Sequence, residues 1–259
     1  MAEHTAPEST IDLEGQVALV TGATSGLGRR FAVLLAANGA RVVATGRRMN
    51  RLESLAEEIG DNGGSCLPIQ LDVTDAEQLS TVVGQAEREL GPVTILVNNA
   101  GIPDAQYATK MPLDLVDRVL DTNLRAPFLL SCEVARRLIA LKLPGRIVNI
   151  SSISAFHYAR GGGAALYSIS KAGVNRVTEA LAVEWAQFGI NVNGIAPGAF
   201  SSEMTDGMIE RVGDMSRAFP RGRMGDPSQL DSTLLYLVSP ASEFVTGTVI
   251  IVDDGQSPR

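Results

Sequence analysis

The chain has 259 residues, of which 45% are hydrophobic, enough for the core of one sizeable α/β domain. Its 29 acidic residues outnumber 22 basic ones, and the formal net charge of -7 argues against nucleic acid or an anionic membrane as the main partner. We find no apolar run of membrane-spanning length, no apolar signal segment in residues 1–15, and no metal-binding spacing between the two cysteines. We therefore expect a soluble cytoplasmic protein that binds no metal.

Short apolar runs alternate with helical patterns from Gly15 onward. Because most runs are β-branched and lack polar alternation, we predict strands that are covered on both faces. These runs are Val17–Val20, Val42–Ala44, Cys66–Leu71, Val93–Val97, Ile147–Ile150, Ile190–Ile195 and Val249–Val252. Between the first two, apolar residues within 27–35 recur with helical spacing. The pattern predicts a Rossmann-type, doubly wound parallel sheet of about seven strands, in a single domain over residues 13–259 after a flexible tail of residues 1–12.

The predicted strands end in polar segments. In a doubly wound sheet, ligands bind where the carboxyl ends of the strands meet. Six ends are rich in glycine, hydroxyl groups, amides or acids: TGATSGLG at 21–28, GRR at 46–48, LDVTD at 71–75, NNAG at 98–101, SSIS at 151–154 and PGAFSSEM at 197–204. Six such ends along one edge predict a shared cofactor cleft.

The first of these segments places three glycines between a strand and a helix. Backbone N–H groups and the positive end of the helix dipole would converge there, which suits a pyrophosphate. We expect Gly22 to permit the bend, Gly26 to permit close approach of the ligand, and Gly28 to permit tight packing of helix on sheet.

The second predicted strand ends in ATGRR, without the acid that usually binds an adenosine ribose 2′-hydroxyl. Arg47 and Arg48 stand there, and a guanidinium suits a 2′-phosphate. The sequence therefore predicts NADP(H) in preference to NAD(H). Asp72, at the end of the third strand, is placed either to bind the adenine amino group or to cap the helix that begins near Asp75.

Tyr167 and Lys171 lie four residues apart at the start of a long predicted helix, so their side chains share one face. An ammonium beside the phenol is expected to lower the tyrosine pKa from about 10 toward neutral. Tyr167 is thereby a candidate acid or base for a carbonyl/alcohol pair.

Taken together, the motifs resemble those of short-chain dehydrogenases/reductases, of the single-domain type with a TGxxxGxG turn and a YxxxK pair. The resemblance runs from about Gly15 to Gln256. It rests on Thr21–Gly28, NNAG at 98–101, Asn123 in DTNL, NISS at 149–152, Tyr167 with Lys171, Pro197–Gly198 and the VTG and VD segments near the C-terminus.

The resemblance implies an enzyme that interconverts a secondary alcohol and a ketone by hydride transfer with a nicotinamide cofactor. Tyr167 would exchange a proton with the substrate oxygen, and Lys171 would hold the nicotinamide ribose and lower the tyrosine pKa. Ser152 would bind the substrate oxygen, and Asn123 would perturb its helix and hold a water that links Lys171 to solvent. Ser154 would restore the usual spacing to the tyrosine, so it stays an alternative to Ser152.

The turn and the resemblance together predict a set of cofactor-binding residues along the cleft. They are Gly22, Thr24, Ser25, Gly26, Leu27, Gly28, Arg47, Arg48, Asp72, Val73, Asn99, Gly101, Tyr167, Lys171, Pro197, Gly198, Phe200 and Ser202. The segment from Pro197 to Ser202 would lie along the nicotinamide.

The substrate stays open between two kinds of molecule. His157, Tyr158 and Arg160 would suit a sugar acid, as in a sugar-acid dehydrogenase. An apolar lid would suit an acyl chain, as in a 3-oxoacyl thioester reductase, and its candidate residues are Met204, Met208, Met215, Phe219 and Met224. A dinucleotide-binding sensor without turnover is the alternative from another class. The resemblance also implies a homotetramer built through the helices that begin near Pro112 and Ala165.

Overall fold

The computed structural model describes residues 11–104, 106–158, 163–214 and 216–257, without the side chains of Met208, Arg211 and Val212. Seven strands form one parallel sheet in the order β3-β2-β1-β4-β5-β6-β7. They are β1 (Val17–Thr21), β2 (Arg41–Gly46), β3 (Ser65–Gln70), β4 (Ile95–Asn98), β5 (Gly145–Ile150), β6 (Ile190–Pro197) and β7 (Val249–Val252). The predicted doubly wound parallel sheet is confirmed.

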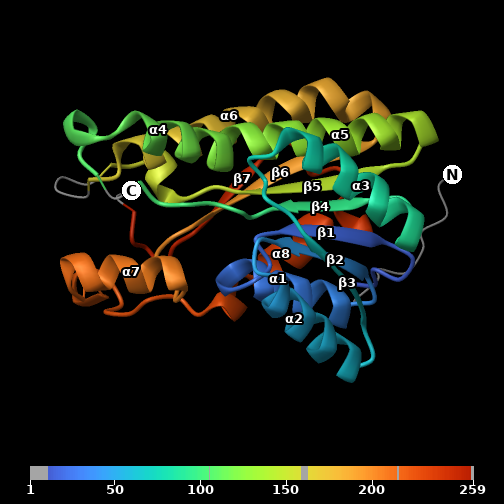
Figure 1. Cartoon of the computed structure of the whole chain (residues 1–259), viewed down its shortest axis with the longest axis horizontal. Coiled ribbons are helices and arrows are strands. Elements are labelled where there is room, and N and C mark those ends of the chain that lie inside the picture. Colours follow the sequence, from blue (N-terminus) through green and yellow to red (C-terminus); the bar gives the residue numbers. More distant parts are fainter. Residues whose placement is uncertain (1–10, 105, 159–162, 215, 258–259) are drawn as a thin grey trace, which may run out of the picture.

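Helices cover both faces of this sheet (Figure 1). One face carries α1 (Gly26–Ala37), α2 (Met49–Asp61) and α8 (Asp231–Val238). The other carries α3 (Ala76–Leu90), α5 (Ala126–Leu141) and α6 (Ala165–Trp185), and α4 (Leu113–Leu120) leads into α5. Helix α7 (Glu203–Val212) lies apart from both layers, beyond one end of the sheet (Figure 1).

Strand β1 shows why the apolar runs lack polar alternation. Its residues are all buried, and they alternate between two cores. Ala18 and Val20 pack with Phe31 of α1, whereas Leu19 packs on the opposite face with Leu130 of α5. Burying a side chain such as Phe31 contributes about 1.5–3 kcal/mol, so both helical layers are held to the sheet by continuous apolar contact.

The N-terminal segment joins the fold at Leu13. This side chain is fully buried, and its N–H donates to the Asn38 carbonyl at 2.8 Å. Most of the predicted tail, residues 1–10, lies outside the described residues. Within the described ranges, no helix combines the length and apolar character needed to cross a membrane.

The strand order reverses between β1 and β4, which are neighbours although β2 and β3 lie between them in the chain. At such a switch point the loops that follow the two strands diverge to opposite faces of the sheet and leave a crevice. The segments after β1 and β4 are the glycine-rich turn and NNAG, so topology brings two predicted parts of the cleft together.

Candidate active site

Two glycines of the turn between β1 and α1 lie where a larger residue would not fit. Gly22 has a φ of 67°, and a Cβ there would lie 3.0 Å from the Ala100 Cα and the Asn99 Nδ2. A Cβ on Gly28 would lie only 2.4 Å from the Gly22 carbonyl oxygen and from Asn99 Nδ2. The contacts at Gly28 are too short for any Cβ, and at Gly22 the tight contacts combine with a positive φ that L side chains rarely adopt. Gly22 and Gly28 therefore permit the turn to pack closely on the segment after β4, and the contact of this turn with a ligand stays a prediction.

The start of α1 suits an anion. Its N-cap, Ser25, makes no side-chain hydrogen bond to the helix, and the first turn contains no acidic residue. The first N–H groups of a helix have no partners within it, and together with the helix dipole they attract phosphate groups. The residues present therefore fit the pyrophosphate of a dinucleotide. Leu27, within this turn, packs against the core.

Polar contacts fix the turn to the NNAG segment. Thr21 Oγ1 accepts hydrogen bonds from the N–H groups of Asn99 and Ala100, both at 3.0 Å. Asn99 Nδ2 in turn donates to the Thr21 carbonyl at 2.9 Å. These bonds hold Asn99 at the switch point, beside the start of α1.

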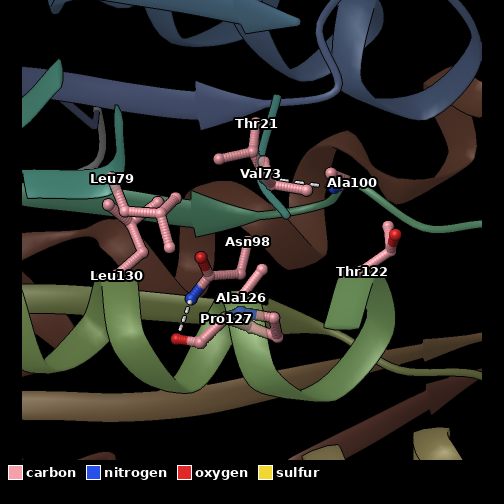
Figure 2. Close-up of a pocket in the computed structure, with 9 residues that line it drawn as sticks. All are labelled: Thr21, Val73, Leu79, Asn98, Ala100, Thr122, Ala126, Pro127 and Leu130. Carbon is pink, nitrogen blue, oxygen red and sulfur yellow. Dashed lines mark hydrogen bonds between the residues drawn. The ribbon is translucent and has the colours of Figure 1, made fainter. Parts of the chain in front are cut away.

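Beneath this contact, Asn98 anchors the end of β4 to the helical layer. Its Nδ2 donates to Ser131 Oγ at 2.9 Å and to Asn149 Oδ1 at 2.8 Å. Figure 2 shows Asn98 pointing toward Pro127, beside a small pocket that Val73 also lines. The space is on the order of one water molecule. We take it as packing beneath the cleft, because neither a coenzyme nor a substrate would fit.

The two candidate arginines occupy different positions at the end of β2. Arg48 is partly buried, and its Nη2 donates to Thr24 Oγ1 at 2.8 Å and to Ser25 Oγ at 3.0 Å. Arg47 is exposed. A groove between the turn and α2 is lined by Thr24, Ser25, Gly26, Arg29, Asn50, Arg51 and Ser54. Sequence reasoning missed Arg51, although its place three residues after Arg48, at the start of a predicted helix, was a usable signal.

Asp72 does not cap α3. That role belongs to Asp75, whose Oδ1 accepts from the N–H groups of Glu77 at 3.0 Å and Gln78 at 3.2 Å. Asp72 Oδ1 accepts instead from the N–H and hydroxyl of Thr74, at 3.0 and 2.8 Å. Of the two readings of Asp72, the helix cap is therefore wrong, and the adenine contact stays a prediction.

Asn123 lies in η2 (Asp121–Arg125), a π-helical turn between α4 and α5. Such turns interrupt α-helices frequently at functional sites. The buried amide pairs with the backbone of Ile102 in both directions, each at 2.9 Å, and Nδ2 also donates to Ser170 Oγ at 3.2 Å. Asn123 therefore perturbs its helix, as expected, and joins the loop after NNAG to α6.

Lys171 lies inside the protein, 4% exposed, and its Nζ donates to the Ile150 carbonyl at 2.8 Å. The same Nζ is 5.8 Å from the centre of the Tyr167 ring. A Cβ on Gly101 would lie 3.5 Å from this Nζ and from Asn123 Oδ1. Burial lowers the Lys171 pKa to about 8, because the ammonium loses contact with water.

The Tyr167 pKa is raised above its ordinary value, so the expected lowering is wrong for this structure. Burial is the main cause, and a hydrogen bond with the Ser152 side chain opposes it. The negative charge of Asp104 raises the pKa further. The Lys171 amine donates to a backbone carbonyl, and we find no contribution from it to the tyrosine pKa.

Ser152 and Ser154 lie two residues apart and make different contacts. Ser152 follows β5, is 8% exposed, and hydrogen-bonds with the side chain of Tyr167. Its Oγ also accepts from the Ser154 N–H at 3.1 Å. This geometry favours Ser152 as the serine that works with Tyr167.

Asp104 is a residue that sequence reasoning missed. It is buried, and its Oδ2 accepts from the backbone N–H of Tyr167 at 3.0 Å. It therefore acts as a side-chain cap for α6, supplied from the loop after β4. Nothing local in the sequence signals this contact, because 63 residues separate the two partners.

The segment Pro197–Ser202 is held by the C-terminal residues. The Gly198 N–H donates to the Val252 carbonyl at 2.9 Å, and the Ala199 N–H donates to Gln256 Oε1 at 2.7 Å. Ser202 caps α7. The Phe200 ring packs in the core against Gly225, so a contact of Phe200 with the cofactor would involve its backbone.

The candidate substrate residues are only partly described. His157 and Tyr158 are exposed just beyond Ser152, whereas Arg160 lies outside the described residues. Among the candidate lid residues, Met204 is exposed, and Phe219 and Met224 are partly buried. Met215 and the Met208 side chain also lie outside the described part.

Comparison with known proteins explains this arrangement. A family model for short chain dehydrogenases matches residues 16–212. The chain belongs to the short-chain dehydrogenase family. Members of this family that resemble it are named dehydrogenases and reductases of alcohol and ketone groups, and the chain is an NAD(P)-dependent oxidoreductase of the same kind.

Two curated relatives act on different substrates. The 3-oxoacyl-(acyl-carrier-protein) reductase FabG of Vibrio cholerae is 36% identical, over 95% of this chain and 98% of the relative. The gluconate 5-dehydrogenase of Gluconobacter oxydans is 37% identical, over 94% of this chain and 95% of the relative.

Solved structures agree with the fold. A short-chain type dehydrogenase/reductase from Mycobacterium marinum matches with a TM-score of 0.92 and 37% identity, over 96% of this chain and 98% of that one. A point variant of actinorhodin polyketide ketoreductase, solved with NADPH, matches with a TM-score of 0.90 and 31% identity, over 94% and 98%.

Proposed function

We propose that this enzyme interconverts a secondary alcohol and a ketone with NADP(H), and that Tyr167 exchanges the proton with the substrate oxygen. The observation that carries the proposal is the cluster of Tyr167 with Ser152, Lys171 and Asn123. These four residues come from three separate segments, which converge at the carboxyl ends of β4 and β5 beside the glycine-rich turn.

Residues outside the proposed proton-transfer group would also bind the coenzyme. The uncapped start of α1 suits the pyrophosphate. Asn99, which contacts the turn, and Gly101, which lies near the Lys171 amine, would bind the coenzyme between the turn and Tyr167. A bound nicotinamide supplies the hydride in reduction and accepts it in oxidation.

The raised Tyr167 pKa keeps the phenol in its protonated form and also makes it a weaker acid. A phenol with a pKa above its ordinary value of about 10 stays protonated at neutral pH. It can therefore donate to the oxygen of a ketone as that oxygen gains negative charge. Ser152 would hold the same oxygen by a hydrogen bond, and it reaches Tyr167 directly.

Lys171 would restore the proton to Tyr167. With a pKa of about 8, its amine exchanges protons readily near neutral pH. Asn123 would connect it to solvent through a water. The contact of Asn123 with Ile102 holds the loop next to Gly101, where both the amine and the amide lie within reach.

The preference for NADP(H) is supported by Arg48. Its guanidinium lies against Thr24 and Ser25 of the turn, and the positive charge and planar donor fork suit a phosphate monoester. Arg51 would add a second guanidinium, because it lines the groove together with Thr24 and Ser25, the two residues that Arg48 contacts. Arg47, exposed nearby, would add charge without a fixed contact.

A homotetramer and a cytoplasmic location are part of the same proposal. Exposed apolar side chains on the outer helical layer, Phe128, Ile169 and Val183, support self-association through α5 and α6. Cys66 and Cys132 are unpaired, which suits a reducing compartment. Light scattering tests the oligomeric state.

The substrate is tested by turnover. NADPH oxidation would be followed with a panel that includes a 3-oxoacyl thioester, a 5-keto sugar acid and simple ketones. Tyr167→Phe is expected to lower kcat at least about 10²-fold on the best substrate, because it removes the general acid, and to bind NADPH as the wild type does. Coenzyme binding without turnover of any substrate by the wild type would instead favour the sensor.

A further inference from the structure

Glu203, the first residue of α7, reaches across to the basic residues of the coenzyme groove. Its Oε2 accepts from Arg48 Nη2 at 2.9 Å, and its Oε1 accepts from Arg48 Nη1 at 3.3 Å. Arg51 pairs with the same carboxylate. The hydrogen bond to Arg48 is the main reason that the Glu203 pKa is lowered to about 2, so the carboxylate is charged at any working pH.

This carboxylate lies at the glycine-rich turn, although 155 residues separate it from Arg48. Ser25 also hydrogen-bonds to it, while Arg48 donates to Thr24 and Ser25. The backbones are close as well, because a Cβ on Gly26 would lie 3.2 Å from the Ser202 Cβ. The start of α7 is thus tied to the start of α1.

The donors around Glu203 form an anion site. Two guanidinium groups and a hydroxyl bind a phosphate by the same hydrogen bonds that they make to a carboxylate. A phosphate monoester carries about −1.5 to −2 charges at pH 7, against one on a carboxylate. The two anions would compete for Arg48 and Arg51.

We propose that Glu203 is a specificity-determining residue that occupies the site of the coenzyme 2′-phosphate. The inference rests on the proposed function, since it takes the groove at Arg48 as the site of the adenosine ribose. A coenzyme with a 2′-phosphate displaces the Glu203 carboxylate and frees the first turn of α7. A coenzyme with a 2′-hydroxyl leaves Glu203 paired.

The exposure of the network makes this exchange feasible. The side chains of Arg48, Arg51 and Glu203 are 41%, 47% and 48% exposed, and ion pairs this exposed contribute little to stability. The displaced carboxylate returns to water at small cost. Glu203 therefore weakens NADP(H) binding moderately and does not prevent it.

The test is coenzyme affinity, measured by titration calorimetry for NADPH and NADH. Glu203→Gln keeps the size of the side chain and removes the competing charge. We expect it to tighten NADPH binding about twofold to fivefold, the effect of one exposed ion pair, and NADH binding less than twofold. Glu210→Gln is the matched control, an exposed acid on the same helix, and it should change neither affinity.

The outcomes separate this inference from the proposed function. Equal tightening of NADPH and NADH by Glu203→Gln would mean a general charge effect and would overturn the role in specificity, as would no tightening of NADPH. A wild type that binds neither coenzyme would instead refute the proposed function, and this inference with it. Hydrogen exchange adds a second readout: NADPH, but not NADH, should speed exchange at the start of α7.

Discussion

Replacing Lys171 with methionine should stabilise the protein at neutral pH while abolishing turnover. Lys171 is 4% exposed, and its lowered pKa means that the folded protein disfavours the charged amine. Methionine has similar length and no charge to desolvate. On this reasoning, the buried Lys171 amine lowers the free energy of unfolding.

The magnitude follows from the pKa. A fall from 10.5 to about 8, at about 1.4 kcal/mol per unit, makes the charged lysine cost about 3 kcal/mol at pH 7. The unfolded chain binds more protons than the folded one between pH 8 and 10.5, so this cost shrinks as the pH rises through that window. About half of it remains at pH 9.5.

The variant also loses the hydrogen bond from Lys171 to the Ile150 carbonyl, worth about 1 kcal/mol. Lys171→Met should therefore be more stable than the wild type by about 1–2 kcal/mol at pH 7, and about equal to it at pH 9.5. Urea denaturation at the two pH values measures both differences. Lys110→Met, at an exposed lysine, is the control and should show no such pH dependence. A variant destabilised by the same amount at both pH values would contradict the reasoning.

The remaining predictions concern the coenzyme and the active serine. Arg48→Asp should shift the ratio of the kcat/KM values for NADP(H) and NAD(H) toward NAD(H) by about tenfold or more. Arg47→Asp should shift it by less, because of the two arginines only Arg48 hydrogen-bonds to the turn. Unchanged ratios in both variants would count against a 2′-phosphate site here. Ser152→Ala should lower kcat about 10²-fold, whereas Ser154→Ala should have little effect, since Ser152 is the serine bonded to Tyr167. The reverse order in steady-state assays would assign the role to Ser154.

The sheet was predictable because its signal is local. Most of the strands are short β-branched runs, and the structure moves the expected ends by no more than two residues, as at β3, which starts at Ser65. The strand β6 extends two residues beyond its expected end, to Pro197. Proline lacks an N–H, and its pairing with Val252 at the end of the strand leaves no donor unmet.

The motif residues of the site were predictable for a similar reason. Gly22 and Gly28 follow from what a turn requires, and helical spacing puts Tyr167 and Lys171 on one face of α6. The roles of these two residues were expected from the family resemblance. Their electrostatics were not predictable, because the Tyr167 pKa depends on how deeply the phenol is buried and on Asp104 beside it. The spacing of residues along a helix predicts neither the burial of the phenol nor the position of Asp104.

The contacts that two acidic residues make with distant segments could not be predicted from the sequence, for one physical reason. Because most acidic residues lie on the surface, an acid in a sequence is taken as solvated unless the fold brings a partner to it. Asp104 becomes the cap of α6 only when the loop after β4 meets the Tyr167 N–H. Glu203 can compete with the coenzyme 2′-phosphate, as we propose, only because the fold brings α7 next to Arg48. Both acids contact residues that the sequence singles out, Tyr167 and Arg48. The sequence therefore identifies the candidate residues, and the packing of loops and helices determines which charges surround them.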